Sequence, residues 1–128
     1  MTQGQVMDAI SVLNRVCKQT MPLKLANRLF KLRQALAPAM QFQIEEEAKL
    51  MEKYPPSRQE GNQLFFDDKE VGRAFNQKLA ELADIESDIE FKPVEIPEGI
   101  DIGIKPDDLG MLQGFVEIIE GDDENGTV

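Results

Sequence analysis

Histidine and tryptophan are absent from this 128-residue chain, which also contains only one tyrosine. Without histidine, the chain lacks the commonest general base and the commonest metal ligand of proteins. Ser-His-Asp and Cys-His mechanisms are therefore excluded in their usual forms. The shortage of large aromatic rings also disfavours a sugar-binding cleft lined with stacking side chains. We therefore expect a protein that is not an enzyme.

Cysteine occurs once, as Cys17, so the chain cannot form an internal disulfide. A reducing compartment is expected on that ground. Cys17 belongs to an apolar helical stripe, which favours a small buried side chain without a chemical role. A reactive thiol beside Arg15 and Lys18 is the less favoured alternative.

Long apolar runs are missing as well. No run approaches the roughly 20 residues that span a bilayer, and the opening residues MTQGQVMDAI lack the pattern of a signal peptide. No glycine-rich phosphate loop is present, and the C-terminal GDDENG does not have the spacing of calcium ligands. We expect no cofactor, no bound metal and no membrane. The expected location is the cytoplasm.

Acidic residues outnumber basic ones by 24 to 14, and the two signs are separated along the chain. Residues 1–60 hold nine basic and six acidic residues, whereas residues 61–128 hold five basic and eighteen acidic ones. Between Asp8 and Glu45 there is no acidic residue at all. Such a separation favours pairing of the two halves, either within one chain or between copies.

Apolar residues recur at spacings of three and four in the first half of the chain, which predicts two helices. The first covers residues 5–19. The second begins near Pro22, with Thr20 as its N-cap, and carries a stripe of leucines along one face. Pro38 predicts a kink or break near Ala37, and YPPSRQEGN (54–62) ends the helix.

The second half of the chain predicts shorter elements. QLFF (63–66) is typical of a short strand or hairpin rim, and a third helix follows, with Asp67 and Glu70 at the spacing of a capping box. Apolar residues then alternate with a period of two from residue 89 to 104, where Pro93 and Pro97 limit any strand to a sheet edge. Residues 105–119 predict a last helix, whose GMLQG (110–114) would permit close packing.

These elements predict a mainly helical α+β fold. Its centre is a long antiparallel helical hairpin, with short helices at both ends and a small irregular β region. Residues 1–120 are expected to form a single domain, and residues 121–128 a disordered acidic tail.

Two groups of charged residues are candidates for binding a partner protein. Lys24, Arg28 and Lys31 recur at spacings of four and three and form a basic stripe on one helix face. The opposite charge gathers in an acidic segment that contains Glu86, Asp88, Glu90 and Glu95. A solvated face and a face for an acidic protein surface explain the stripe equally well. Nucleic acid is less favoured, because the acidic half of the chain repels a polyanion.

The order of these parts resembles a family of small, uncharacterised proteins encoded by tailed phages and prophages of Firmicutes. The likeness covers roughly residues 6–119. It includes MPLKLANRLFKLRQALAPAMQFQIEEEAKLMEKY, then FNQKLAELADIESDIEFKPVEI, then GIKPDDLGMLQGFVEII. The resemblance implies a phage or prophage product that acts by protein contact, and it supplies no catalytic residues. It also implies a location in the cytoplasm of a bacterial host, or in a virion.

The sequence therefore favours a non-enzymatic phage or prophage protein that acts through protein–protein contact, for example as an assembly or accessory factor, with self-association as one form of that contact. The first alternative is an acidic mimic of nucleic acid that inhibits a host or defence protein. An enzyme with carboxylate chemistry is the least favoured alternative.

Overall fold

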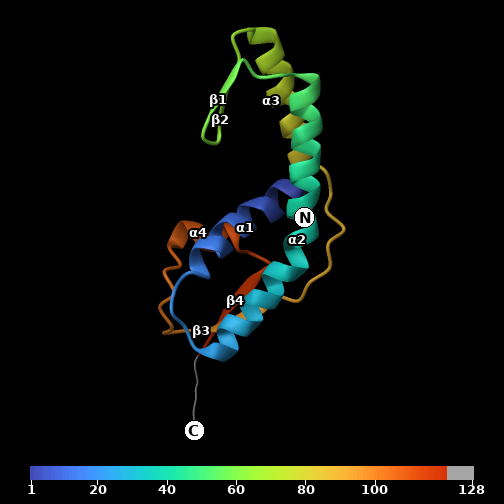
Figure 1. Cartoon of the computed structure of the whole chain (residues 1–128). Helices are drawn as coiled ribbons and strands as arrows, with labels where there is room; N and C mark the ends of the chain where they lie inside the picture. The colour runs from blue at the N-terminus through green and yellow to red at the C-terminus, as the bar shows by residue number, and fades with distance from the viewer. Residues whose placement is uncertain (121–128) are drawn as a thin grey trace.

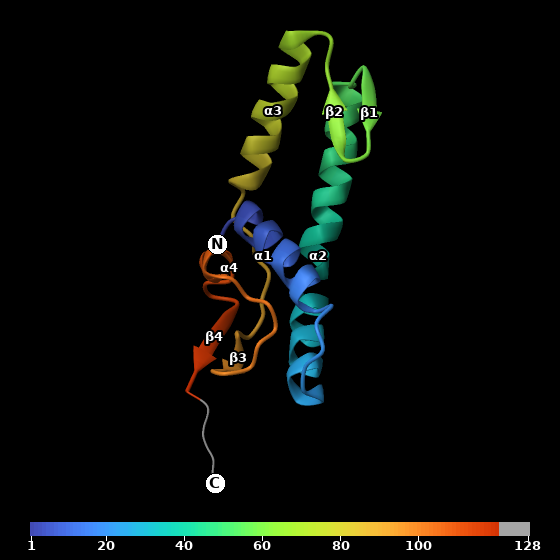
Figure 2. The same cartoon turned by 90° about the vertical axis from the view of Figure 1, so that its left-hand side faces the viewer.

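The computed structural model describes residues 1–120, so the expected acidic tail at 121–128 lies outside the described residues. In chain order the elements are α1 (Gln3–Val16), α2 (Leu23–Lys53), β1 (Arg58–Glu60), β2 (Gln63–Phe65), α3 (Lys69–Ala83), β3 (Val94–Pro97), α4 (Pro106–Met111) and β4 (Val116–Ile119). Figures 1 and 2 show two regions. The body contains α1, the first half of α2, β3, α4 and β4. The arm contains the second half of α2, the β1–β2 hairpin and α3.

Helix α1 lies at the centre of the body and contacts α2, α3 and α4. Thr2 caps its N-terminus: the Thr2 hydroxyl accepts a hydrogen bond from the Gln5 amide, and the Gln5 side chain accepts one from the Thr2 amide. Seven of its fourteen residues are buried. Its buried apolar side chains are Val6, Ala9, Ile10, Val12, Leu13 and Val16. The apolar stripe expected for residues 5–19 therefore faces the core.

Helix α2 is a single element of 31 residues, about 46 Å long at 1.5 Å per residue. It begins after Pro22, so the prediction that Thr20 is the N-cap was wrong. Of the kink or break predicted near Ala37, the break is absent, because the helix continues through Pro38. Its axis changes direction between the body and the arm, as Figure 1 shows. The leucine stripe is confirmed as its core face, with Leu25, Leu29, Leu32 and Leu36 all buried.

The arm confirms the predicted antiparallel pairing of the second and third helices. The β1–β2 hairpin joins them, with Glu60 opposite Gln63 in antiparallel register. Helix α3 is capped by Asp68, whose side chain accepts hydrogen bonds from two amides of the first turn, so Asp67 was the wrong choice of cap. In the arm Phe75 is buried and lies beside Phe66, with ring centroids 5.2 Å apart. The main buried cluster of the chain lies in the body.

The C-terminal part differs most from the prediction. The last helix, α4, has only six residues, and residues 116–119 form β4 instead of continuing it. β4 pairs in parallel with β3, so that Val94 lies opposite Val116 and Ile96 opposite Ile118. A positive φ of 87° at Gly114 is incompatible with continued helix geometry. No atom lies within 4 Å of a Cβ built on Gly110, so the predicted close packing of GMLQG was wrong there.

The fold class is thus confirmed as mainly helical α+β. The region between α3 and β3 remains extended without a strand until Val94, and both strands of each two-stranded sheet are edge strands. The expectation that the prolines confine strands to edges is therefore met: Pro97 ends β3, and Pro93 immediately precedes it.

A substitution at Gly4 tests the junction between α1 and α3. A Cβ at Gly4 would lie 3.1 Å from the Ala83 Cβ and 3.2 Å from the Ala83 carbonyl oxygen. Gly4→Val should therefore lower the free energy of unfolding by roughly 1–3 kcal/mol, as overpacking does. Gly110→Val, also in a helix but with open space around it, is the matched control and should change stability by less than about 0.5 kcal/mol. Equal effects of the two variants in urea unfolding would contradict this packing.

Candidate interaction surfaces

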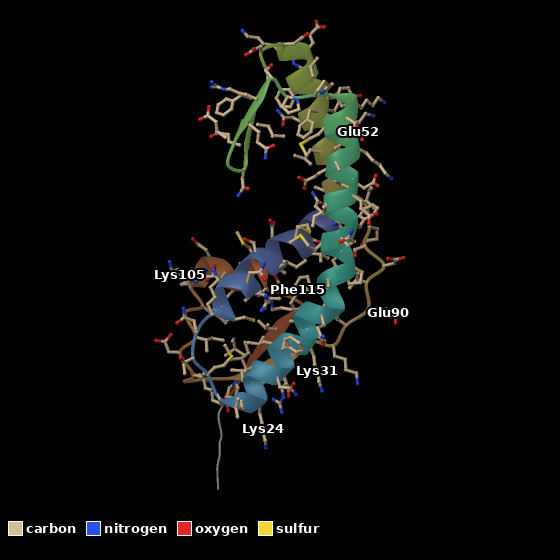
Figure 3. All side chains as sticks on the ribbon, viewed as in Figure 1. Lys24, Lys31, Glu52, Glu90, Lys105 and Phe115 are labelled. Atoms are coloured by element: carbon tan, nitrogen blue, oxygen red, sulfur yellow. The ribbon has the colours of Figure 1, made fainter. Side chains whose placement is uncertain are left out.

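The basic stripe is exposed along the first half of α2. Lys24, Arg28 and Lys31 all have exposed side chains, and Figure 3 shows Lys24 and Lys31 projecting from the helix. Within residues 1–120 no ion pair involves any of these three residues. Within the described part of the chain, the basic stripe is therefore not paired with the acidic half of the sequence.

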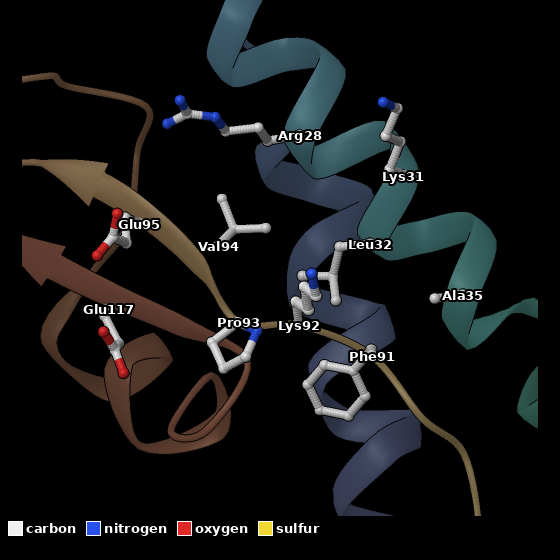
Figure 4. Close-up of a pocket in the computed structure, with 10 residues that line it drawn as sticks. All are labelled: Arg28, Lys31, Leu32, Ala35, Phe91, Lys92, Pro93, Val94, Glu95 and Glu117. Atoms are coloured by element: carbon white, nitrogen blue, oxygen red, sulfur yellow. The ribbon is translucent and has the colours of Figure 1, made fainter.

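A shallow cleft lies beside the stripe, between α2 and the β3–β4 pair (Figure 4). Its cavity volume is about 460 Å³. Arg28 and Lys31 form one wall, and Glu95 and Glu117 lie on the strand side. The remaining lining is mostly apolar and consists of Leu32, Ala35, Phe91, Lys92, Pro93 and Val94.

The cleft brings together two predicted site residues that are far apart in the sequence, Arg28 and Glu95. Glu117 was not among the predicted site residues, because residues 116–119 were expected to be helical. In the parallel pair Glu95 lies directly opposite Glu117, and like charges opposite each other on neighbouring strands are destabilising. This pair of carboxylates is therefore a local cost to the fold, which a cation placed between them would offset.

The other acidic candidates do not reach the stripe side of the cleft. Glu86, Asp88 and Glu90 follow α3 in an extended segment, where all three are exposed and alternate with half-buried Ser87 and Ile89. Glu86 forms an ion pair with the α-amino group of Met1, at 2.5 Å. The backbone next to Glu86 is also hydrogen-bonded to the start of α1, since the Gln3 amide donates to the Ile85 carbonyl.

An ion pair that the sequence did not reveal joins α1 to the start of α4. The Arg15 guanidinium donates to the Asp108 carboxylate and, at 2.9 Å, to the Gly103 carbonyl. Asp108 is nearly buried, and it also accepts the Lys105 amide at 2.8 Å. The backbone bond from Lys105, followed by the bond from Arg15, lowers the pKa of the Asp108 carboxyl below its usual value. Both residues hold α4 against the body, so their role is structural.

Cys17 is half-buried, not fully buried as expected. It packs against the edge of the core and lines a hollow together with Met21, Phe30 and Arg33. Among residues 1–120, no group of three or more Cys, Asp or Glu side chains is arranged to hold a metal ion. Within the same range no helix is both long enough and apolar enough to cross a membrane.

Comparisons with protein families, with curated proteins and with solved structures find no match to this chain. They neither support nor contradict the resemblance to tailed-phage proteins.

The lowered pKa of Asp108 generates a pH prediction. A depressed pKa in the folded state stabilises the fold above the unfolded-state value of about 4, and this contribution is lost as the pH falls below that value. Asp108→Asn should therefore lower Tm at pH 7 and flatten the fall in Tm between about pH 5 and pH 2. Asp107→Asn, an exposed neighbour on α4, is the control. Parallel Tm profiles for wild type and Asp108→Asn would contradict the assignment.

Proposed function

We propose that this is a non-enzymatic protein of a phage or prophage that acts through protein–protein contact, as an assembly or accessory factor. One observation carries the proposal: Arg28 and Lys31 are exposed, lack ion-pair partners within residues 1–120, and border a cleft with a largely apolar lining. Exposed cations beside apolar surface favour a partner that offers carboxylates next to an apolar side chain. The resemblance to tailed-phage proteins supports the biological setting.

The charges around the cleft favour a polypeptide over nucleic acid. Glu95 and Glu117 lie on the same cleft as the basic wall, so a phosphate backbone placed against Arg28 would be repelled from the opposite side. The formal net charge of −10 adds long-range repulsion. A peptide segment with an acidic residue toward α2 and a basic residue toward β3 and β4 satisfies both walls at once.

The dimensions of the cleft limit how much of a partner it accepts. A volume of about 460 Å³ suits a few side chains and not a whole domain. We therefore expect a short extended segment or one turn of a helix to occupy it. The cation supplied by such a segment would also relieve the repulsion between Glu95 and Glu117.

The acidic mimic is retained as a second candidate because of the row formed by Glu86, Asp88 and Glu90. These carboxylates are exposed and spaced two residues apart in the segment between α3 and β3. Such a line of negative charges is suited to a basic groove that otherwise holds a nucleic acid.

Site-specific photo-crosslinking tests the cleft as a binding site. A photoreactive amino acid replaces Lys92, an exposed residue on the cleft, in cells that carry the gene. We expect an adduct with one protein, reduced at least about fivefold by Arg28→Glu, since charge reversal at a contact typically costs 1 kcal/mol or more. The same probe at Gln59, exposed on the hairpin, is the matched control.

Three results would decide between the candidates. An adduct at Lys92 that exceeds the Gln59 control and depends on Arg28 supports the cleft. An adduct that survives Arg28→Glu but is lost in Asp88→Lys/Glu90→Lys assigns the contact to the acidic row and favours the mimic. Equal labelling at Lys92 and Gln59 contradicts binding at the cleft.

A further inference from the structure

Helix α2 carries an apolar face that nothing covers among the described residues. Leu23, Phe30, Ala37 and Ile44 recur every seven residues, an interval of almost two helical turns, so they lie along one side of the helix. The exposed fractions are 87 % for Leu23 and 55 % for both Phe30 and Ile44, and Ala37 is also exposed. We call these four residues the seam.

The seam is distinct from the two faces of α2 already described. At 100° per residue it lies roughly a third of a turn from the buried leucines and roughly a third of a turn from the basic stripe. The fold is therefore complete without it, and the cleft beside β3 lies on another side. Exposed aliphatic and aromatic side chains at a repeat of seven are typical of a helix that packs against another helix.

The shape around Phe30 suits such packing. One hollow between α1 and α2, of about 310 Å³, is lined by Phe30, Arg33, Ala37 and Met40 together with residues of α1. A second, of about 420 Å³, is lined by Phe30, Cys17 and Met21 among others. An exposed ring that lines two hollows offers both the knob and the holes that helix pairing requires.

The charges beside the seam indicate what covers it. Lys24 and Lys31, which also belong to the basic stripe, and Glu45 and Glu52 are all exposed. They lie on the same side of the seam, each about 100° around the helix from the nearest position of the seven-residue repeat. They also follow the seven-residue interval, with the exposed Pro38 at its midpoint. Figure 3 shows Lys24 and Lys31 on the body half of α2 and Glu52 on the arm half. The row is thus basic before Pro38 and acidic after it.

We propose that the seam is a homodimer interface in which α2 of a second copy packs antiparallel across it. A two-fold axis near Pro38 places Lys24 near Glu52 of the other copy and Lys31 near Glu45, because each pair is equidistant from residue 38. Because of the two-fold symmetry, every such contact occurs twice in the dimer. Parallel packing would instead bring like charges together, so the charge row selects the antiparallel orientation. Ala37, near the axis, has a small side chain that permits close approach of the helices.

Sedimentation equilibrium of the full chain over a range of concentrations tests the seam. Wild type is expected to reach twice the chain mass of 14.4 kDa. Leu23→Asp/Phe30→Asp should weaken the dimer at least about 100-fold, because each copy loses two apolar contacts and gains two buried charges. Leu109→Asp/Met111→Asp, at two exposed apolar positions on α4, is the control and should leave the dimer intact. Circular dichroism checks that every variant is folded.

A charge exchange tests the antiparallel orientation. Lys31→Glu alone and Glu45→Lys alone should each weaken the dimer about three- to tenfold at low salt, through two exposed pairs per dimer. The double variant Lys31→Glu/Glu45→Lys should restore wild-type affinity. A double variant weaker than either single variant would overturn the antiparallel arrangement.

The remaining outcomes concern the occupant of the seam. A wild-type monomer at all concentrations, or a dimer insensitive to Leu23→Asp/Phe30→Asp, would overturn the proposal. If the seam residues lose solvent exposure only when another protein is added, the face binds that protein, and the dimer proposal is overturned. Leu23→Asp/Phe30→Asp alters no residue of the cleft, so loss of the dimer in this variant leaves binding at the cleft to be judged by its own crosslinking experiment. Lys31→Glu also changes the basic wall of the cleft, so it is used only to test the orientation of the dimer.

Discussion

Burial of α1 among the other three helices is the constraint on which the rest of the structure depends. Its apolar side chains Val6, Ile10, Val12, Leu13 and Val16 are all buried. Their transfer from water contributes on the order of 10 kcal/mol as an upper estimate, which is comparable with the whole stability of a typical domain. Buried Gln3 also orients α1 against α2, because its side-chain amide donates hydrogen bonds to the Ala39 carbonyl, at 2.9 Å, and to the Gln43 side chain. The start of α1 is thereby fixed to the middle of α2.

This constraint determines how α2 can be used. Only one of its faces is required by the fold, since Leu25, Leu29 and Leu32 pack on the body. The basic stripe and the seam are left for contacts outside the chain. One helix therefore serves three purposes with three faces, each separated by roughly a third of a turn. The arm extends the same helix beyond the body, where few side chains are buried, and such regions open locally at low energetic cost.

The helices were predictable from the sequence because their signals are local. The leucine stripe of α2 and the apolar stripe of α1 are both periodic over several turns, and the structure places both in the core. Pro38 was expected to kink or break α2. The helix does not break, but it changes direction between the body and the arm, and Pro38 itself is exposed to solvent. The cap at Asp68 was misplaced by one residue, which is the usual uncertainty at helix ends.

The C-terminal elements were not predictable in the same way, because they depend on contacts between distant segments. Leu112, Phe115 and Val116 have helical spacing, yet the positive φ of Gly114 and parallel pairing with Val94 turn the chain into a strand. That pairing creates the acidic side of the cleft by placing Glu117 beside Glu95. The Arg15–Asp108 ion pair was likewise hidden, since the two residues are 93 positions apart. The basic residues of the cleft were predicted from the sequence. The shape of the cleft was not, because it depends on how distant segments pack together.

The central claim is that the outer faces of α2 are contact surfaces and not merely solvated ones. Hydroxyl-radical footprinting of wild-type protein, carried out at dilute and at high concentration, tests it most directly. The account predicts that oxidation of Leu23, Phe30 and Ile44 falls as concentration rises, while the exposed α4 residues Leu109 and Met111 are oxidised equally at both concentrations. Unchanged oxidation of all five side chains would contradict it.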